Sequence, residues 1–261
     1  MRKDSRKASY KNFKYMKKYL FFVLLFVCGI CVANDEVQPY MTVEQLPNLI
    51  KCLPAPPAFD SPEFANDLVR YAWGRQQRMD EHRAEIARRD AVWNYDSLFA
   101  EFNMPFGLVI SKEGTPEIYK LLITSLTTTD AMRVAPKAFY HRLRPFEYLG
   151  DHMLIESEEQ DLRGEGSYPS GHTHRGYTCA LLLAEINPAK ADTILARGWM
   201  YGESRVIDGA HWQSDVDASR VSAAIGYGAL HTCPAFLNQM ALAQTEFLKM
   251  TGKCTKKSKK R

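Results

Sequence analysis

Residues 212–250 read WQSDVDASRVSAAIGYGALHTCPAFLNQMALAQTEFLKM, and this stretch decides the fold class. It favours two helices, over 212–231 and 234–250. The first turn of a helix tolerates the missing N–H of a proline, so Pro234 is compatible with the start of the second helix.

The helical pattern continues toward the N-terminus. Further helices are predicted over 115–131, 172–186 and 188–203, with Pro188 again at a start. Asp60-Ser61-Pro62-Glu63 combines a capping oxygen, a first-turn proline and an early acid, so it predicts a helical stretch that runs to Val92. Only residues 106–110 run like a short strand. We expect one all-α, soluble globular domain of packed helices over residues 60–250.

The composition agrees with a globular domain, and the net charge of +4 is concentrated at the two ends. Of the 261 residues, 46% are hydrophobic and 25% are charged. Residues 34–59 carry several prolines that forbid long regular structure, so they predict an extended leader. Residues 251–261 form a basic tail, either a solvated end or a contact for acidic lipid or polysaccharide.

The N-terminus is typical of a secretory signal peptide. A basic segment (1–18) precedes an apolar run (20–33) that is shorter than the about 20 residues a membrane span needs. We expect cleavage after Ala33, although an uncleaved anchor helix is the alternative. Met16-Lys-Lys begins a more typical signal, so residues 1–15 could lie upstream of the true start. The mature protein is therefore expected to be periplasmic or secreted, with no stable membrane insertion.

Four cysteines remain after signal cleavage: Cys52, Cys179, Cys233 and Cys254. They allow three full pairings, and the sequence cannot choose among them, although a Cys179–Cys233 bridge is one guess. Their spacing does not resemble a zinc site.

Three segments stand apart from the helical background: KAFYHRLRP (137–145), GSYPSGHT (166–173) and SRVIDGAHWQSD (204–215). In the second, Pro169-Ser170-Gly171-His172 is a turn that enters a helix, and free N–H groups at a helix start bind anions. In the first, Lys137 and Arg144 lie two helical turns apart, so one helix could present both before Pro145 ends it.

The third segment adds a possible nucleophile. The planar guanidinium of Arg205 suits phosphate oxygens. His211 and Asp215 lie four residues apart, so on a helix the carboxylate could hold Nδ1–H and leave a lone pair on Nε2. Three cations, a backbone anion site and two histidines fit transfer of a tetrahedral anion better than acyl transfer. Each piece alone has a simpler interpretation: a helix cap, a solvated charged face or a surface pair.

Together, the pattern Lys-x6-Arg-Pro, Pro-Ser-Gly-His and Ser-Arg-x5-His-x3-Asp resembles the signature of the type 2 phosphatidic acid phosphatase superfamily. The string 166–173, together with a signal peptide, resembles the bacterial class A non-specific acid phosphatases. The resemblance implies an exported acid phosphatase that hydrolyses many small-molecule phosphate monoesters through a phosphohistidine, with possible phosphotransferase side activity. It also implies a homo-oligomer that needs no metal or cofactor and binds no nucleic acid as such.

The same resemblance assigns roles. His211 would be the nucleophile, Asp215 its orienting acid and His172 the general acid and base. Phosphate would be held by these residues: Lys137, Arg144, Ser170, Gly171 and Arg205. Metal ligation by the two histidines is the alternative that these neighbouring cations oppose.

Other readings of the motifs remain. Vanadium haloperoxidases share the pocket pattern, but the short chain and the resemblance of residues 166–173 to acid phosphatases argue against them. Membrane-embedded lipid or polyprenyl-diphosphate phosphatases share it too, but this sequence lacks their further apolar spans. A periplasmic phosphate binder would need the cations but not the His211–Asp215 pair. The acidic residues 146–165 form either a lid over the site or a solvated loop.

Overall fold

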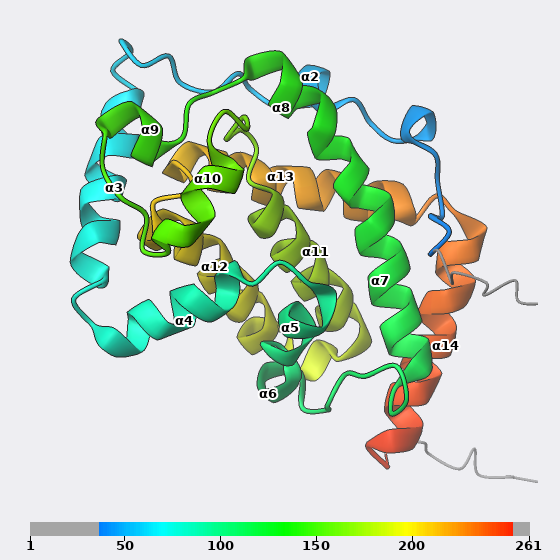
Figure 1. The fold of residues 1–261 in the computed structure, drawn as a ribbon. Coiled ribbons are helices and arrows are strands. Elements are labelled where there is room, and N and C mark those ends of the chain that lie inside the picture. The colour runs from blue at the N-terminus through cyan, green and yellow to red at the C-terminus, as the bar shows by residue number, and fades with distance from the viewer. Residues whose placement is uncertain (1–36, 253–261) are drawn as a thin grey trace, which may run out of the picture. The chain divides into compact units, whose positions relative to one another are not determined.

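The computed structural model describes residues 37–252 (Figure 1). The predicted signal peptide, the start of the leader, the tail from residue 253 and Cys254 lie outside the described residues.

Residues 37–252 contain helices and no strand, so the prediction of an all-α domain is confirmed. The α-helices are α2 (Leu49–Cys52), α3 (Phe64–Gln77), α4 (Glu81–Ala91), α5 (Tyr95–Ala100), α6 (Asn103–Phe106), α7 (Pro116–Asp130), α8 (Val134–Tyr140), α9 (Pro145–Leu149), α10 (Glu159–Leu162), α11 (Gly171–Ile186), α12 (Ala191–Asp208), α13 (Gln213–Leu230) and α14 (Pro234–Met250). Short 3-10 turns are η1 (Val43–Gln45), η2 (Ala131–Arg133), η3 (Glu156–Glu158) and η4 (Pro188–Lys190). Among the described residues, no helix has the length and apolar character to cross a bilayer.

Helix α11 lies at the centre of the domain. It packs most extensively against α12 and α13 and also contacts α7, while α14 runs along α7 (Figure 1). Because neighbours surround it, α11 is buried around most of its circumference, from Thr173 to Ile186. Its N-terminus is therefore held rigidly inside the molecule.

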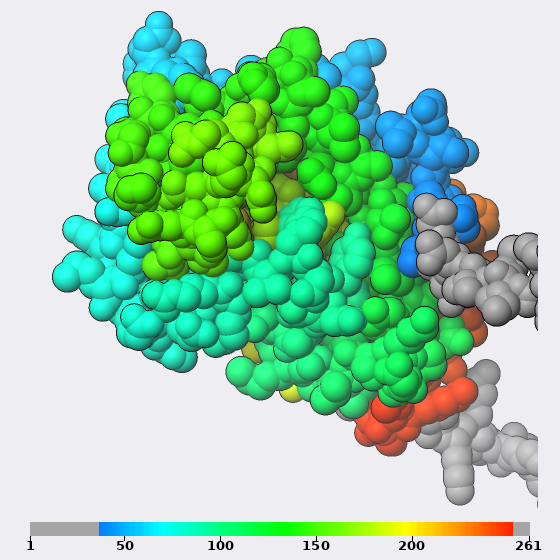
Figure 2. All heavy atoms as spheres, in the orientation of Figure 1, coloured from blue at the N-terminus to red at the C-terminus, as the bar shows by residue number. Residues whose placement is uncertain are grey.

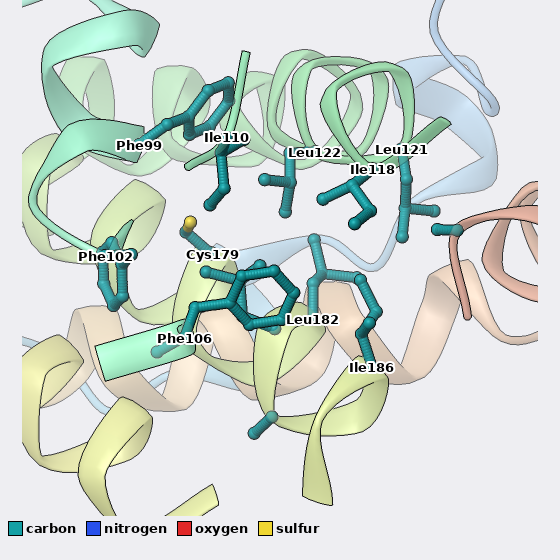
Figure 3. Close-up of a cluster of buried hydrophobic side chains, with 14 of the residues drawn as sticks. Phe99, Phe102, Phe106, Ile110, Ile118, Leu121, Leu122, Cys179, Leu182 and Ile186 are labelled. Carbon is teal, nitrogen blue, oxygen red and sulfur yellow. The ribbon is translucent and has the colours of Figure 1, made fainter. Parts of the chain in front are cut away.

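The main core lies at the other end of α11. Phe99, Phe102 and Phe106 from the α5–α6 region are fully buried against apolar side chains of α7 and α11 (Figure 3). Cys179 points into this cluster (Figure 3). The described cysteines Cys52, Cys179 and Cys233 are free, so the guessed Cys179–Cys233 bridge is wrong.

Three local predictions need correction. The stretch from Asp60 to Val92 is two helices, because the carboxylate of Asp80 caps a new start by accepting hydrogen bonds from the backbone N–H groups of His82 and Arg83, at 3.0 and 3.3 Å. Residues 106–110 are not a strand, since α6 ends at Gly107 with φ of 93°.

Lys137 and Arg144 do not share one helix. Helix α8 ends at Tyr140, because His141 takes a left-handed conformation with φ of 42°. Arg144 instead stands at the N-cap of α9, directly before Pro145. The two cations are therefore brought together by a turn and not by helical spacing.

Candidate active site

A cavity of about 410 Å³ opens at the N-terminus of α11. Figure 2 shows the surface hollowed between the green segments around α8 and α10 and the teal segment that joins α4 to α5. Six of the predicted site residues line the cavity: Lys137, Arg144, Gly171, His172, Arg205 and His211. Ser170 and Asp215 do not line it and lie directly behind Gly171 and His211.

Ser170 is the N-cap of α11. Its buried Oγ accepts hydrogen bonds from the N–H and hydroxyl of Thr173, at 3.4 and 3.0 Å. A Cβ on Gly171 would lie 3.1 Å from the Arg133 side chain and 3.3 Å from the Trp93 ring, so a larger residue at this position would crowd both. The start of α11 thus reaches the cavity as bare backbone, which favours an anion there.

Three cations converge on the cavity from three elements. Lys137 of α8 donates a hydrogen bond to the carbonyl of Gly166. Arg144 Nη1 donates to the carbonyl of Ala210 at 2.9 Å. Arg205 of α12 pairs with Asp208 at 3.1 Å, while its buried Nε and Nη1 have no hydrogen-bond partner within residues 37–252. Unpartnered guanidinium donors facing a cavity are suited to an anionic ligand.

The cations also perturb one another. Burial, followed by repulsion from Arg144 and Arg133, lowers the pKa of Lys137 to about 7. Burial, followed by repulsion from Arg205, lowers the pKa of Arg144 to about 10. A bound anion would relieve both effects, because it stabilises the charged forms.

His211 lies in the turn between α12 and α13, directly before the predicted helix 212–231, so its contact with Asp215 does not depend on helical spacing. Its Nδ1 is 3.4 Å from Asp215 Oδ2, and its Nε2 is 3.2 Å from Arg144 Nη1. A guanidinium can only donate, so this contact requires a lone pair on Nε2. Burial, then Arg144 and Lys137, holds the pKa of His211 well below its usual value. The imidazole is therefore neutral, with its proton on Nδ1.

His172 occupies the first turn of α11. Its Nε2 lies 2.9 Å from the carbonyl oxygen of Ala91, and its ring centroid lies 4.3 Å from that of Trp93. Burial, followed by repulsion from Arg205, lowers its pKa well below the usual value. Both imidazoles thus face the same cavity in a strongly positive environment.

The sequence left one part of the site open and missed another. Residues 146–165, expected as either a lid or a solvated loop, supply an acidic wall of Glu158, Asp161 and Glu165. The missed residue is Arg142, which bridges Asp215 and the distant Asp67. Arg142 lies inside the segment 137–145, but no spacing could link it to Asp67 of α3. Among the described residues, no group of three or more His, Cys, Asp or Glu side chains is placed to hold a metal ion.

Comparison with known proteins agrees with this geometry. The profile of the PAP2 superfamily matches residues 118–239. The non-specific acid phosphatase of Providencia stuartii is 40% identical over 212 residues, which span 81% of this chain and 85% of the relative. That of Salmonella typhimurium is 36% identical over 230 residues, 88% of this chain and 92% of the relative. An acid phosphatase of Zymomonas mobilis is 34% identical over 221 residues, 85% of this chain and 83% of the relative. The chain therefore belongs to the PAP2 superfamily and, within it, to the non-specific acid phosphatases.

Proposed function

We propose that this protein is an exported acid phosphatase that hydrolyses many phosphate monoesters through a phosphohistidine at His211. One observation carries the proposal: the lone pair of His211 Nε2 and the unpartnered donors of Arg205 belong to the same cavity. Relatives named non-specific acid phosphatase support the reaction class.

Phosphate binding falls to the cations and the helix start. Lys137, Arg144 and Arg205, with the backbone N–H of Gly171, would hold the three non-bridging oxygens. Ser170, which does not line the cavity, would support binding by capping α11. The cations and the Gly171 N–H contact phosphate and not the alcohol, so a broad range of leaving groups is expected. Positive charge from the protein stabilises the spread charge of a loose phosphoryl transition state. The reaction is therefore expected to survive EDTA.

In the first step, the Nε2 lone pair of His211 forms a bond to phosphorus as the bond from phosphorus to the leaving oxygen breaks. His172, in its protonated form, gives its proton to that oxygen. Asp215 stabilises the positive charge that develops on His211 by accepting the Nδ1 hydrogen bond.

In the second step, water attacks phosphorus and the N–P bond breaks. His172 accepts a proton from the water, inorganic phosphate leaves, and His211 returns to its neutral form. If an alcohol takes the place of water, the same step transfers phosphate to that alcohol, which accounts for a phosphotransferase side activity.

A mildly acidic optimum follows from these roles. His172 must carry a proton while His211 must not, and the surrounding cations lower the pKa of both. The negative charge of a bound phosphate group offsets the repulsion from Arg205 and favours the protonated form of His172.

The decisive experiment traps the intermediate. Brief reaction with a 32P-labelled monoester, followed by denaturation, should yield an acid-labile, base-stable adduct that maps to the peptide containing His211. His211→Ala should give no adduct and no turnover yet still bind inorganic phosphate. An adduct on another residue, or turnover by His211→Ala, would refute the covalent scheme.

Export and assembly are separate parts of the proposal. The basic segment and apolar run at residues 1–33 support a signal peptide, and fractionation of cells that express the full chain tests it. The family resemblance supports a homo-oligomer, which sedimentation equilibrium of the secreted product tests.

A further inference from the structure

Three buried charged residues lie behind His211 and do not line the cavity: Asp67 of α3, Arg142 between α8 and α9, and Asp215 of α13. Their exposed fractions are 1%, 5% and 0%. Charges buried this deeply interact strongly, because little water screens them.

Asp215 is held from both of its oxygens. Oδ1 accepts a hydrogen bond from Arg142 Nη1 at 2.6 Å. Oδ2 accepts one from the backbone N–H of Trp212 at 2.9 Å and lies 3.4 Å from His211 Nδ1. The arginine therefore fixes the rotation of the carboxylate that faces the imidazole.

Arg142 is itself fixed from the far side. Its Nη2 donates to Asp67 Oδ2 at 2.8 Å, and its Nη1 donates to Ser214 Oγ at 2.8 Å. Asp67 also accepts hydrogen bonds from the backbone N–H and hydroxyl of Ser214, at 2.8 and 2.6 Å. The guanidinium lies 5.7 Å from the ring centroids of both Phe59 and Trp212. The connected network joins α3 to the first turn of α13.

The charges of this network bear on His211. A lone buried carboxylate beside an imidazole draws a proton onto it, which would occupy the lone pair needed for attack. Arg142 offsets part of that negative charge, and Asp67 in turn offsets part of the charge on Arg142. His211 is also faced by cavity groups from four other elements: Lys137, Arg144, His172 and Arg205.

We propose that Arg142 is a positioning residue, which aligns Asp215 on His211 Nδ1 and offsets its charge so that the nucleophile stays neutral. The inference rests on the proposed role of His211 as the nucleophile. Arg142 does not line the cavity, so its effect on His211 passes through Asp215.

The test compares four variants with the full secreted enzyme, using p-nitrophenyl phosphate across the pH range. Arg142→Met should lower kcat by about 10- to 100-fold, as loss of an outer partner of a catalytic group commonly does. The inhibition constant of inorganic phosphate should not change. The apparent pKa of the acid limb of kcat/KM should rise by about one pH unit, because the carboxylate of Asp215 then favours protonated His211. Arg142→Lys keeps the charge, so its acid limb should stay near that of the wild type with partly restored kcat.

Asp67→Asn gives a prediction of opposite sign. Arg142 then acts more strongly on Asp215, so the acid limb should move to lower pH. Arg220→Met is the matched control, because Arg220 is also 5% exposed and paired with carboxylates, but these are Glu203 and Asp217 and not Asp215. Its pH profile should match that of the wild type.

If Arg142→Met does not fold, the other two variants decide the question: the acid limb should move to lower pH in Asp67→Asn and stay near that of the wild type in Arg142→Lys. An acid limb that stays fixed in Asp67→Asn, or that shifts as far in Arg220→Met as in Arg142→Met, would overturn the inference. His211→Ala, assayed alongside, separates the two failures: an active His211→Ala refutes the proposed function, whereas an inactive one with unmoved profiles refutes only the role of Arg142.

Discussion

At the scale of single residues, the main feature of the site is the buried positive charge of Arg205, whose hydrogen-bond donors are only partly paired among the described residues. Arg205 is 1% exposed, and Asp208 and the more distant Glu158 are the carboxylates beside it. Two of its buried nitrogens have no hydrogen-bond partner within residues 37–252. Such an arrangement is costly in the empty enzyme and is relieved when an anion binds. Binding and catalysis should therefore be very sensitive to the shape of this guanidinium.

Arg205→Lys should lower kcat/KM for p-nitrophenyl phosphate by about 10²–10³-fold, because a single ammonium cannot replace a planar fork of donors. Arg163→Lys is the control, since the side chain of Arg163 is 54% exposed and does not line the cavity. Equal activity in the two variants would mean that Arg205 contributes charge alone.

Lys137 makes anion binding depend on pH. Its pKa in the empty cavity is about 7, lowered mainly by burial. Above that pH, Lys137 is neutral in the free enzyme and must take up a proton before its ammonium form can pair with an anion. The affinity of the enzyme for the anion should therefore fall by up to about tenfold per pH unit. Sulfate stays a dianion throughout, so its inhibition constant between about pH 6 and pH 9 measures the effect. Lys137→Met should bind sulfate weakly with little dependence on pH in that range, and an unchanged slope would contradict the assignment.

At the scale of elements, each side of the cavity comes from a different kind of segment. The start of α11 supplies backbone, the turn between α8 and α9 supplies Arg144, and the region of η3 and α10 supplies an acidic wall. Glu158 Oε2 lies 3.9 Å from Arg205 Nη2. The wall thus places negative charge next to Arg205, one of the cations proposed to bind phosphate.

Glu158→Gln should lower KM for phosphate monoesters at neutral pH by about two- to fivefold, because it removes a competing negative charge near the cavity mouth. The benefit should fade in acid, since burial raises the pKa of Glu158 and the carboxyl is then protonated in the wild type. Glu156→Gln is the control, because Glu156 belongs to the same turn but does not line the cavity. A KM that rises in Glu158→Gln would show that Glu158 assists binding.

At the scale of the whole molecule, the core and the site lie on different parts of α11. The first turn of α11 meets the cavity, while Cys179, Leu182 and Ile186 lie in the main core (Figure 3). The core therefore stabilises the helix whose N-terminus lines the cavity, without contributing side chains to the cavity.

Phe102→Ala should destabilise the protein by about 3–5 kcal/mol, because a fully buried ring leaves a void. Urea unfolding measures the loss, and kcat/KM of the folded protein should not change. Met104→Ala, two residues away and 84% exposed, should have no effect on either quantity. Loss of activity in folded Phe102→Ala would show that core packing reaches the site.

The sequence by itself determined the features that depend on neighbours along the chain. Helices over 172–186 and 234–250 were predictable because apolar spacing and first-turn prolines act locally, and the structure has them at 171–186 and 234–250. The three segments with Lys137, His172 and His211 could be grouped as one candidate phosphate site because their residue types suit that chemistry together, and the structure brings the three residues to one cavity.

Tertiary structure alone decided how those residues meet. The left-handed conformation of His141 ends α8 between Lys137 and Arg144, yet both side chains line the same cavity. The Asp67–Arg142–Asp215 network joins residues 75 and 73 positions apart. Helical periodicity carries no information at such separations, because these contacts are set by the packing of α3 against α12 and α13.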